Sequence, residues 1–182
     1  MLEISLHILD IVENSTRAGA RNVAIEITED DERDRLTVEV RDDGTGMDRE
    51  TIQKALDPFY TTKTVRRVGL GLPLLSEAAE RAGGSFEIES QEGEGTTVRA
   101  EFGYSHLDRQ PLGNITGTII TLIAGNPEVN FIYRHTKNGK VFTLDSSEIK
   151  QELDGVPINH TDVLSFLRGR IEEGLEEIGV KP

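Results

Sequence analysis

Apolar residues recur at two different spacings in the first part of the chain, and each spacing predicts its own kind of element. Residues 4–17 place isoleucine, leucine and valine at helical intervals, which predicts an amphipathic helix. Residues 23–27 and 36–40 instead alternate apolar with polar side chains, which predicts two strands joined by the charged turn EDDERDR. The pattern then predicts, in order, a helix at 48–56, the loop DPFYTTKTVRRVG, a helix at 70–82, and strands at 86–90 and 96–102.

This order, α-β-β-α-loop-α-β-β, predicts a fold of class α/β: a two-layer sandwich in which helices cover a mixed or antiparallel sheet. The composition changes after Tyr104. From there the pattern predicts a small α+β extension, with a helix near 115–123, a hairpin turning at Asn138-Gly139 and a final helix near 163–178. We therefore expect one domain at residues 1–104 and a second region at residues 105–182, a candidate for partner binding or dimerisation.

The composition restricts the kinds of site that the chain can hold. Its 182 residues include no cysteine and carry a formal net charge of −13. The lack of cysteine excludes disulfides, thiol catalysis and cysteine-based metal sites. The acidic charge argues against nucleic acid as a partner, because phosphate backbones are bound by clustered Lys and Arg. No apolar run approaches the ~18 residues of a membrane span, and no signal peptide precedes the first helix. We therefore expect a cytoplasmic protein that does not contact a membrane.

One face of the first helix is polar although the rest of that helix is apolar. His7, Asp10, Asn14 and Arg17 fall within an arc of roughly 80° at about 100° per residue. The carboxamide oxygen of Asn14 suits Mg²⁺, and Asp10 is placed to accept a proton from an attacking water or hydroxyl. Arg17 can pair with phosphate oxygens. In an arbitrary helix, however, such a row more often faces solvent, and a histidine such as His7 more often packs or is exposed than borders a ligand.

Two glycine-bearing segments add weak signals for a nucleotide. Gly69-Leu70-Gly71 opens a helix, where free N–H groups and the positive end of the helix dipole favour phosphate. The segment DDGTGM places Asp42 at a strand end before Gly44 and Gly46. The carboxylate there can accept a hydrogen bond from an exocyclic amine such as that of adenine. Taken singly, each segment is explained as well by an ordinary turn or loop-to-helix junction.

Together and in this order, the segments resemble the motifs of the GHKL ATPase superfamily, which joins gyrase-type topoisomerases, chaperones, histidine kinases and mismatch-repair proteins. The resemblance covers about residues 2–103. DIVENSTRAGA is similar to the N-box, DDGTGM to the first glycine box, DPFYTTK to the F-box of the nucleotide lid, GLGLPLL to the second glycine box, and GEGTTVRAEF to the final one. The resemblance implies a fold that binds ATP together with Mg²⁺.

The resemblance also implies roles for the residues around the base and the metal. Asn14 would coordinate Mg²⁺, and Asp42 would bind the adenine amino group. Thr96 would support Asp42 through the same hydrogen-bond network. Gly44 and Gly46 would flank the base.

For the lid and the phosphates, the resemblance implies that Phe59 and Tyr60 anchor the lid, and that the phosphates are contacted by Lys63, Gly69, Leu70 and Gly71. The chain departs from the histidine-kinase pattern here. Histidine kinases of the PFYTTK type usually read GTGLGL, whereas this chain reads RVGLGL, with Arg67 and Val68 in place of glycine and threonine. The direction of the effect on lid closure is left open by the sequence.

Two further roles concern the polar helix face. Arg17 occupies the position at which histidine kinases usually carry a phosphate-binding lysine. Asp10 occupies the position at which hydrolytic members and anti-sigma serine kinases carry a glutamate general base. Aspartate is one methylene shorter, so its reach to a catalytic water is the open point.

The rest of the chain bears on which kind of member this is. The region after residue 104 has neither the length nor the glycine-rich start of a transducer domain, so we do not expect an ATP-gated clamp. Only six residues precede His7, so we do not expect the dimerising hairpin that carries the phosphoacceptor histidine of histidine kinases. The segment SHLDRQPL resembles the phosphoacceptor box SHELRTPL, but no long amphipathic helix precedes it. We interpret it as a connector in which His106 or Asp108 caps or packs against the fold.

Two functions therefore remain open. The protein is either an enzyme that transfers the γ-phosphoryl group of ATP to a separate protein or to water, with Asp10 as base, or a non-catalytic ATP-dependent regulatory or protein-binding module. The presence of Asp10 favours the enzyme. The expected partners are ATP and a protein partner or protein substrate, and a homodimer is compatible with the sequence.

Overall fold

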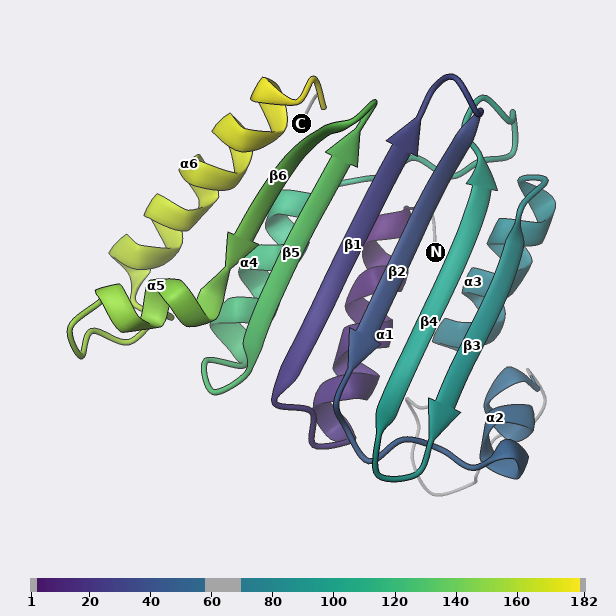
Figure 1. Ribbon diagram of the computed structural model, residues 1–182, viewed down its shortest axis with the longest axis horizontal. Helices are drawn as coiled ribbons and strands as arrows, with labels where there is room; N and C mark the ends of the chain where they lie inside the picture. Colours follow the sequence, from purple (N-terminus) through teal and green to yellow (C-terminus); the bar gives the residue numbers. More distant parts are fainter. Residues whose placement is uncertain (1–2, 58–69, 181–182) are drawn as a thin grey trace.

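The computed structural model describes residues 3–57 and 70–180. Its elements, in chain order, are α1 (Ile4–Arg17), β1 (Asn22–Asp30), β2 (Arg35–Asp42), α2 (Arg49–Leu56), α3 (Gly71–Arg81), β3 (Ser85–Gln91), β4 (Gly95–Gly103), α4 (Ile115–Gly125), β5 (Asn130–Lys137), β6 (Lys140–Asp145), α5 (Ser146–Glu152) and α6 (Thr161–Glu177) (Figure 1). The helices and strands expected from the sequence are present. The short helix α5 was not predicted, because seven residues are too few for a clear helical period.

The strands form one mixed sheet in the order β3-β4-β2-β1-β5-β6. Neighbouring strands are antiparallel except for β1 and β5, which run parallel from the pair Asn22–Asn130 to the pair Glu29–Lys137. The hairpin between β5 and β6 turns at Asn138-Gly139, and both residues have positive φ. A two-residue turn with two positive φ angles matches the twist of the flanking strands, so the predicted hairpin is confirmed.

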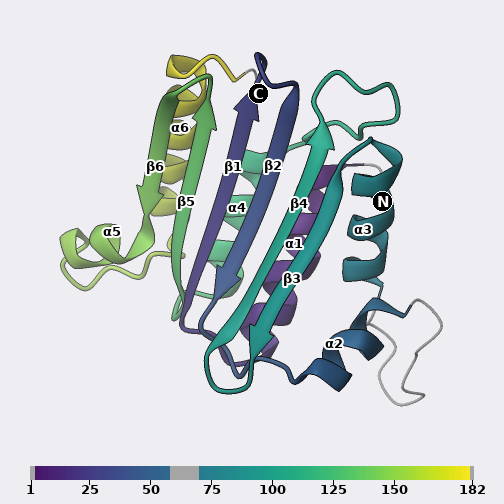
Figure 2. The same cartoon turned by 45° about the vertical axis from the view of Figure 1, so that its right-hand side comes forward.

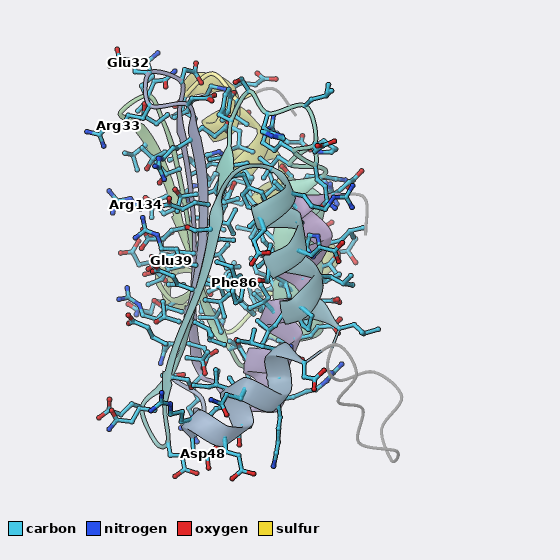
Figure 3. All side chains as sticks on the ribbon, turned by 90° about the vertical axis from the view of Figure 1, so that its right-hand side faces the viewer. Glu32, Arg33, Glu39, Asp48, Phe86 and Arg134 are labelled. Carbon is cyan, nitrogen blue, oxygen red and sulfur yellow. The ribbon has the colours of Figure 1, made fainter. Side chains whose placement is uncertain are left out.

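Helices cover one face of the sheet and leave the other open, which confirms the predicted two-layer α/β sandwich (Figures 2 and 3). The alternation along β1 explains the layers. Val23, Ile25 and Ile27 are buried, and the intervening residues point to the opposite side, as strand geometry requires. Glu39 and Arg134 project from the open face (Figure 3). Burial of the apolar rows under the helices is the main force that holds the layers together.

The part of the chain after Tyr104 extends this sheet, because β5 pairs with β1. A continuous apolar core runs through both parts. The connector before α4 also binds α1: the backbone N–H groups of Ile4 and Ser5 donate to the carbonyl oxygens of Pro111 and Leu112 at 3.0 and 2.8 Å. These bonds satisfy two N–H groups that a helix start leaves free. Both parts thus share one sheet, and the expected domain boundary at residue 104 stays a prediction.

Two predictions from the sequence concern the loop and the membrane. Most of the loop DPFYTTKTVRRVG lies outside the described residues, and so do the predicted site residues Phe59, Tyr60, Lys63 and Gly69. Across residues 3–57 and 70–180, none of the helices combines the length and the apolar character that a membrane span requires.

Candidate functional site

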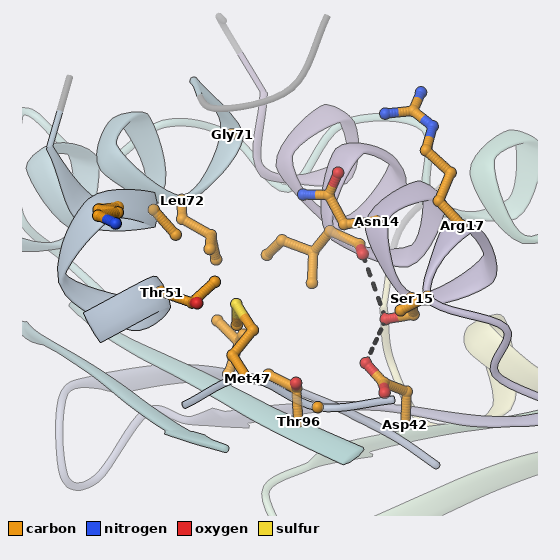
Figure 4. Close-up of a pocket in the computed structure, with 15 residues that line it drawn as sticks. Asn14, Ser15, Arg17, Asp42, Met47, Thr51, Gly71, Leu72 and Thr96 are labelled. Carbon is orange, nitrogen blue, oxygen red and sulfur yellow. Dashed lines mark hydrogen bonds between the residues drawn. The ribbon is translucent and has the colours of Figure 1, made fainter. Parts of the chain in front are cut away.

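A cavity of about 570 Å³ opens between α1, α2, α3 and the facing ends of β2 and β4 (Figure 4). Segments that are far apart in the sequence meet around it. Its walls are formed by Ile11, Asn14, Ser15, Arg17, Ala18, Asp42, Gly46, Met47, Thr51, Lys54, Ala55, Gly71, Leu72, Thr96 and Val98. The set includes the predicted site residues Asn14, Arg17, Asp42, Gly46, Gly71 and Thr96.

Asp42 ends β2 and presents its carboxylate to this cavity. Its Oδ1 accepts the backbone N–H of Gly44 at 2.9 Å, and its Oδ2 accepts the hydroxyl of Ser15 at 2.5 Å (Figure 4). Two donors from different elements therefore fix the orientation of the carboxylate. Because each carboxylate oxygen has a further lone pair, Asp42 can still accept a hydrogen bond from a molecule in the cavity.

The neighbouring Asp43 binds the start of β1 instead of facing the cavity. Its Oδ1 accepts the backbone N–H groups of Arg21 and Asn22 at 2.8 and 2.9 Å, and its Oδ2 accepts the Asn22 side chain at 2.7 Å. Burial alone would raise the pKa of Asp43, but the hydrogen bonds from Asn22 and Arg21 lower it. Of the two acids in DDGTGM, Asp43 thus accepts hydrogen bonds from the start of β1, and Asp42 faces the cavity.

Ser15 is a cavity residue that the sequence analysis did not identify. It continues the buried stripe of Ile4, Ile8 and Ile11 at helical spacing, and only 3% of it is exposed. Besides its bond to Asp42, its hydroxyl lies 3.3 Å from the carbonyl oxygen of Ile11. A hydroxyl within the apolar stripe of a helix was the available signal, because a buried polar group needs a partner.

The polar row of α1 divides into cavity residues and packing residues. Asn14 and Arg17 line the cavity. The guanidinium of Arg17 lies 3.2 Å from the carboxylate of Glu13, and the two side chains are 46% and 47% exposed. Such exposed pairs contribute little stability, so Arg17 can exchange Glu13 for another anion. His7 is buried and its Nε2 lies 2.9 Å from Oε1 of Gln110, so it packs against the connector. Burial lowers the pKa of His7.

Asp10 lies beside the cavity rather than in its wall, against the first turn of α3. A Cβ placed on Gly71 would lie 3.1 Å from the Cβ of Asp10, so glycine at this position allows α1 and α3 to approach closely. Gly71 is also the first residue of α3, where unpaired N–H groups and the positive end of the dipole are found. A carboxylate and a helix N-terminus therefore meet at the edge of the cavity.

The other predicted site residues take varied positions. Gly46 has a φ of +67°, and a Cβ there would overlap the carbonyl of Gln91, so glycine lets the loop after β2 pack on the end of β3. Thr96 lines the cavity, and its hydroxyl lies 2.7 Å from that of Ser90. Its predicted support of the cavity acid stays a prediction. Leu70 precedes α3 and is 56% exposed.

The helix α2 supplies a wall that the sequence analysis left unassigned. Its start is fixed by Asp48, whose side chain accepts the backbone N–H of Thr51 at 2.7 Å. Together with the loop before it, α2 contributes Met47, Thr51, Lys54 and Ala55 to the cavity. Ile11, Leu72 and Val98 add apolar surface. Apolar walls around one oriented carboxylate suit a flat ring that carries a hydrogen-bond donor.

The segment SHLDRQPL is a connector, as expected. It has no helical structure, and the backbone N–H of Asp108 donates to Nδ1 of His106 at 3.1 Å. His106 therefore carries its ring proton on Nε2 when neutral. The segment leads from the end of β4 to α4, and Asp42, which marks the cavity, pairs with the opposite end of β4.

Comparison with known proteins decides the family. The family model described as "Histidine kinase-, DNA gyrase B-, and HSP90-like ATPase" matches residues 3–106. This is more than half of the chain. The chain belongs to this ATPase family. The sensor histidine kinase YxdK of Bacillus subtilis is 33% identical over 97 residues, which covers 50% of this chain and 30% of the relative. Sporulation kinase C of the same organism is 30% identical over 91 residues, which covers 50% of this chain and 21% of that protein.

Similarity to a solved structure covers more of the chain than the family model does. The crystal structure of the N-terminal domain of a DNA repair protein is similar at a TM-score of 0.57 and 15% identity, covering 96% of this chain and 59% of that chain. At this identity the likeness concerns the fold alone, and it includes the sheet extension after residue 106. Membership of the ATPase family supports ATP as the molecule that the cavity binds. The chain spans less than a third of the two kinases named above, so their activities do not transfer as a whole.

Proposed function

We propose that this protein binds Mg·ATP in the cavity and transfers the γ-phosphoryl group to a separate protein or to water. The observation that carries the proposal is the carboxylate of Asp42, held at the cavity by Ser15 and Gly44 at 2.5 and 2.9 Å. A carboxylate so oriented before a ligand arrives recognises an amino group without paying for reorganisation. The N6 amino group of adenine is such a donor, and the surrounding apolar side chains suit its ring.

The phosphates belong at the other side of the cavity. Asn14 and Arg17 line it from α1, and Gly71 brings the N-terminus of α3 to its edge. Free N–H groups at a helix start and an arginine both bind phosphate oxygens. Lys63 and Gly69, outside the described residues, stay predicted phosphate contacts.

A metal site with one protein ligand fits this arrangement. Mg²⁺ usually keeps several waters and shares the oxygens of its substrate phosphates. The carboxamide of Asn14, on the cavity wall, is the group that would hold it. The bound ion would neutralise negative charge on the phosphates.

Asp10 is the proposed base. Its place against the first turn of α3 puts it beside the phosphate side of the cavity. In the proposed step an attacking water or protein hydroxyl forms a bond to the γ-phosphorus, the bond to the ADP oxygen breaks, and Asp10 takes the proton.

One observation favours a second candidate function. Asp10 is packed against Gly71 and is not part of the cavity wall, and its side chain is short for a base in this position. A protein that binds ATP without turning it over would act as a regulatory or protein-binding module. For a protein kinase or a regulatory module we also propose a protein partner, because the transferred group or the signal then needs a destination outside the ATP site. We further propose a cytoplasmic location.

Calorimetry and single-turnover assays test the proposal on the same preparations. Asp42→Asn should weaken ATP binding about 100-fold, because it replaces an acceptor of a charged hydrogen bond with an amide that also offers a donor. Asp43→Asn is the matched control and should keep wild-type affinity, since Asp43 faces β1. Unchanged affinity in Asp42→Asn would refute the assignment of the cavity.

Turnover is followed with γ-labelled ATP, with and without candidate protein acceptors. The wild-type protein should release labelled phosphate or form a phosphoprotein, and Asp10→Ala should lose this turnover while it still binds ATP. Turnover that persists in Asp10→Ala contradicts the role of Asp10. Tight binding without turnover in the wild-type protein instead supports the regulatory module.

A further inference from the structure

The helix α6 forms the rim of the molecule next to the edge strand β6 (Figure 1). Its inner face is buried against α4 and β6, with Leu167, Ile171 and Leu175 in the core. Gly174 lies so close to Phe142 that a Cβ would overlap the ring. This inner face fixes which side of α6 is turned outward.

The outer face of α6 exposes a large aromatic side chain. Phe166 is 63% exposed. Single exposed apolar residues are common, so exposure alone indicates nothing. Phe166 is distinguished by two opposite charges that flank it on the same outer face. Asp162 lies about one helical turn before it and Arg170 about one turn after it.

Both charges flanking Phe166 are available to a partner. The side chain of Asp162 is 93% exposed, and the ring of His160 lies 3.8 Å from it. Nδ1 of His160 already accepts the backbone N–H of Asp162 at 3.3 Å. A neutral His160 ring therefore has no proton on Nδ1 to donate to the carboxylate of Asp162. Arg170 is exposed, and the described residues include no ion-pair partner for it. Gly169, next to Arg170, has nothing within 4 Å of where its Cβ would be.

We propose that α6 pairs antiparallel with α6 of a second copy of this chain, about a two-fold axis that passes beside Phe166. Asp162 and Arg170 each lie four residues from Phe166, about 6 Å along the helix axis, in opposite directions. Reversing one helix about Phe166 therefore brings Asp162 of each copy opposite Arg170 of the other. The two Phe166 rings meet at the axis between two symmetric ion pairs.

Charge selects this arrangement over the alternative. A parallel pairing in register would place Asp162 against Asp162 and Arg170 against Arg170, and like charges in contact are unfavourable. In the antiparallel pairing Gly169 faces Val163 of the second copy, where the missing side chain allows the helices to approach. An interface of this kind is isologous, with the same patch on both copies, as in most homodimers.

The pairing leaves the cavity accessible. The helix α6 lies at the β6 edge of the sheet, away from α1, α2 and α3 (Figure 1). Residues of these three helices line the cavity. The dimer therefore carries two separate cavities, and its test is independent of what they bind.

Sedimentation velocity across a concentration series tests the proposal with the full chain. The wild-type protein should shift from one to two chain masses as its concentration rises. Phe166→Ala should weaken association at least tenfold, and circular dichroism should be unchanged because the position is exposed. Arg168→Asp is the matched control, since Arg168 is exposed on α6 but lies away from Phe166 around the helix, and it should associate like the wild-type protein.

Charge exchange tests the geometry. Asp162→Arg and Arg170→Asp should each be monomeric alone, because each brings like charges together. An equimolar mixture of the two should form a heterodimer, since both pairs then hold opposite charges. A wild-type protein that stays monomeric at all concentrations overturns the proposal. So does a dimer unaffected by Phe166→Ala, or a mixture of the charge variants that stays monomeric.

Discussion

Among the described residues, Ser15 is the one whose side chain donates a hydrogen bond to the carboxylate of Asp42. The bond joins α1 to the end of β2 at the wall of the cavity. A hydrogen bond to a charged group contributes about 1.5–3 kcal/mol, and this one also selects the orientation in which Asp42 meets a ligand. We therefore propose that Ser15 acts on ligand binding by orienting Asp42.

Replacing Ser15 by alanine tests this role. We expect Ser15→Ala to weaken ATP binding about tenfold, because Asp42 loses a partner and must be oriented on binding, and about 1.4 kcal/mol corresponds to a factor of ten. Calorimetry gives the affinity. Thr16→Ala is the matched control: its hydroxyl donates to the carbonyl oxygen of Glu13 at 3.0 Å and takes no part in the cavity wall. Equal affinities for Ser15→Ala and Thr16→Ala would contradict the positioning role.

At the scale of elements, the contact between α1 and α3 shapes the side of the cavity where we propose that the phosphates bind. Gly71→Ala places a methyl group 3.1 Å from the Cβ of Asp10, closer than an unstrained contact. Because the position of a Cβ atom is set by the backbone that carries it, we expect the two helices to move apart slightly. We expect a lower melting temperature and weaker ATP binding, since the N-terminus of α3 moves away from α1.

Thermal denaturation and calorimetry measure both effects of Gly71→Ala. Gly125→Ala is the control, because Gly125 also lies at a helix end but has nothing within 4 Å of its Cβ position. A Gly71→Ala protein that melts and binds ATP like the wild type would show that α1 and α3 do not need this close approach.

Local patterns predicted the elements of this fold but could not predict how distant elements pair. The alternation around Ile25 and the turn at Asn138-Gly139 depend on neighbouring residues, and the predicted strands and hairpin are present. The parallel pairing of β1 with β5 joins residues more than a hundred positions apart. It depends on helix packing, which no local period encodes. The extension after Tyr104 therefore looked separate in the sequence although it continues the sheet.

The residues of the candidate site likewise fall into two groups: those that local patterns in the sequence predicted, and those whose role depends on how distant elements pack. Asn14 and Asp42 stood out because polar residues interrupted apolar patterns within recognisable motifs. Ser15 did not, since a serine is inconspicuous until the structure brings Asp42 to it. The part of the cavity wall that α2 forms was not predicted either, because it depends on how the residues around Thr51 pack in the folded chain.

At the scale of the whole molecule, a buried polar network ties the two parts of the chain together. Nε2 of His135 lies 2.7 Å from Oε1 of Glu29, and Nζ of Lys137 donates to Oε2 of Glu29 at 3.1 Å. Lys137 also donates to the Tyr104 hydroxyl at 3.1 Å, and the Tyr133 hydroxyl lies 2.7 Å from Nδ1 of His135. The network joins β1 to β5 on the helix-covered side of the sheet. It gives His135 a structural role.

The network predicts how stability depends on pH. Burial alone would raise the pKa of Glu29, but hydrogen bonds from His135 and Lys137 outweigh it and lower the pKa from its ordinary 4.5 to about 2. A carboxylate with a depressed folded-state pKa stabilises the fold fully above its unfolded pKa and loses that contribution as the pH falls toward the folded one. The contribution, on the order of 3 kcal/mol, should therefore be present at pH 7 and decline as the pH falls from about 4.5 toward 2.

Urea denaturation at pH 7 and at pH 3 measures this loss. In Glu29→Gln, stability should already be lower at pH 7, because His135 and Lys137 face a neutral group, and its further decrease at pH 3 should be smaller than in the wild-type protein. Glu26→Gln on the same strand is the control, since Glu26 lies on the open face of the sheet, and its decrease should match the wild type. If Glu29→Gln and Glu26→Gln lose equal stability between the two pH values, Glu29 does not hold the two parts of the sheet together through its charge.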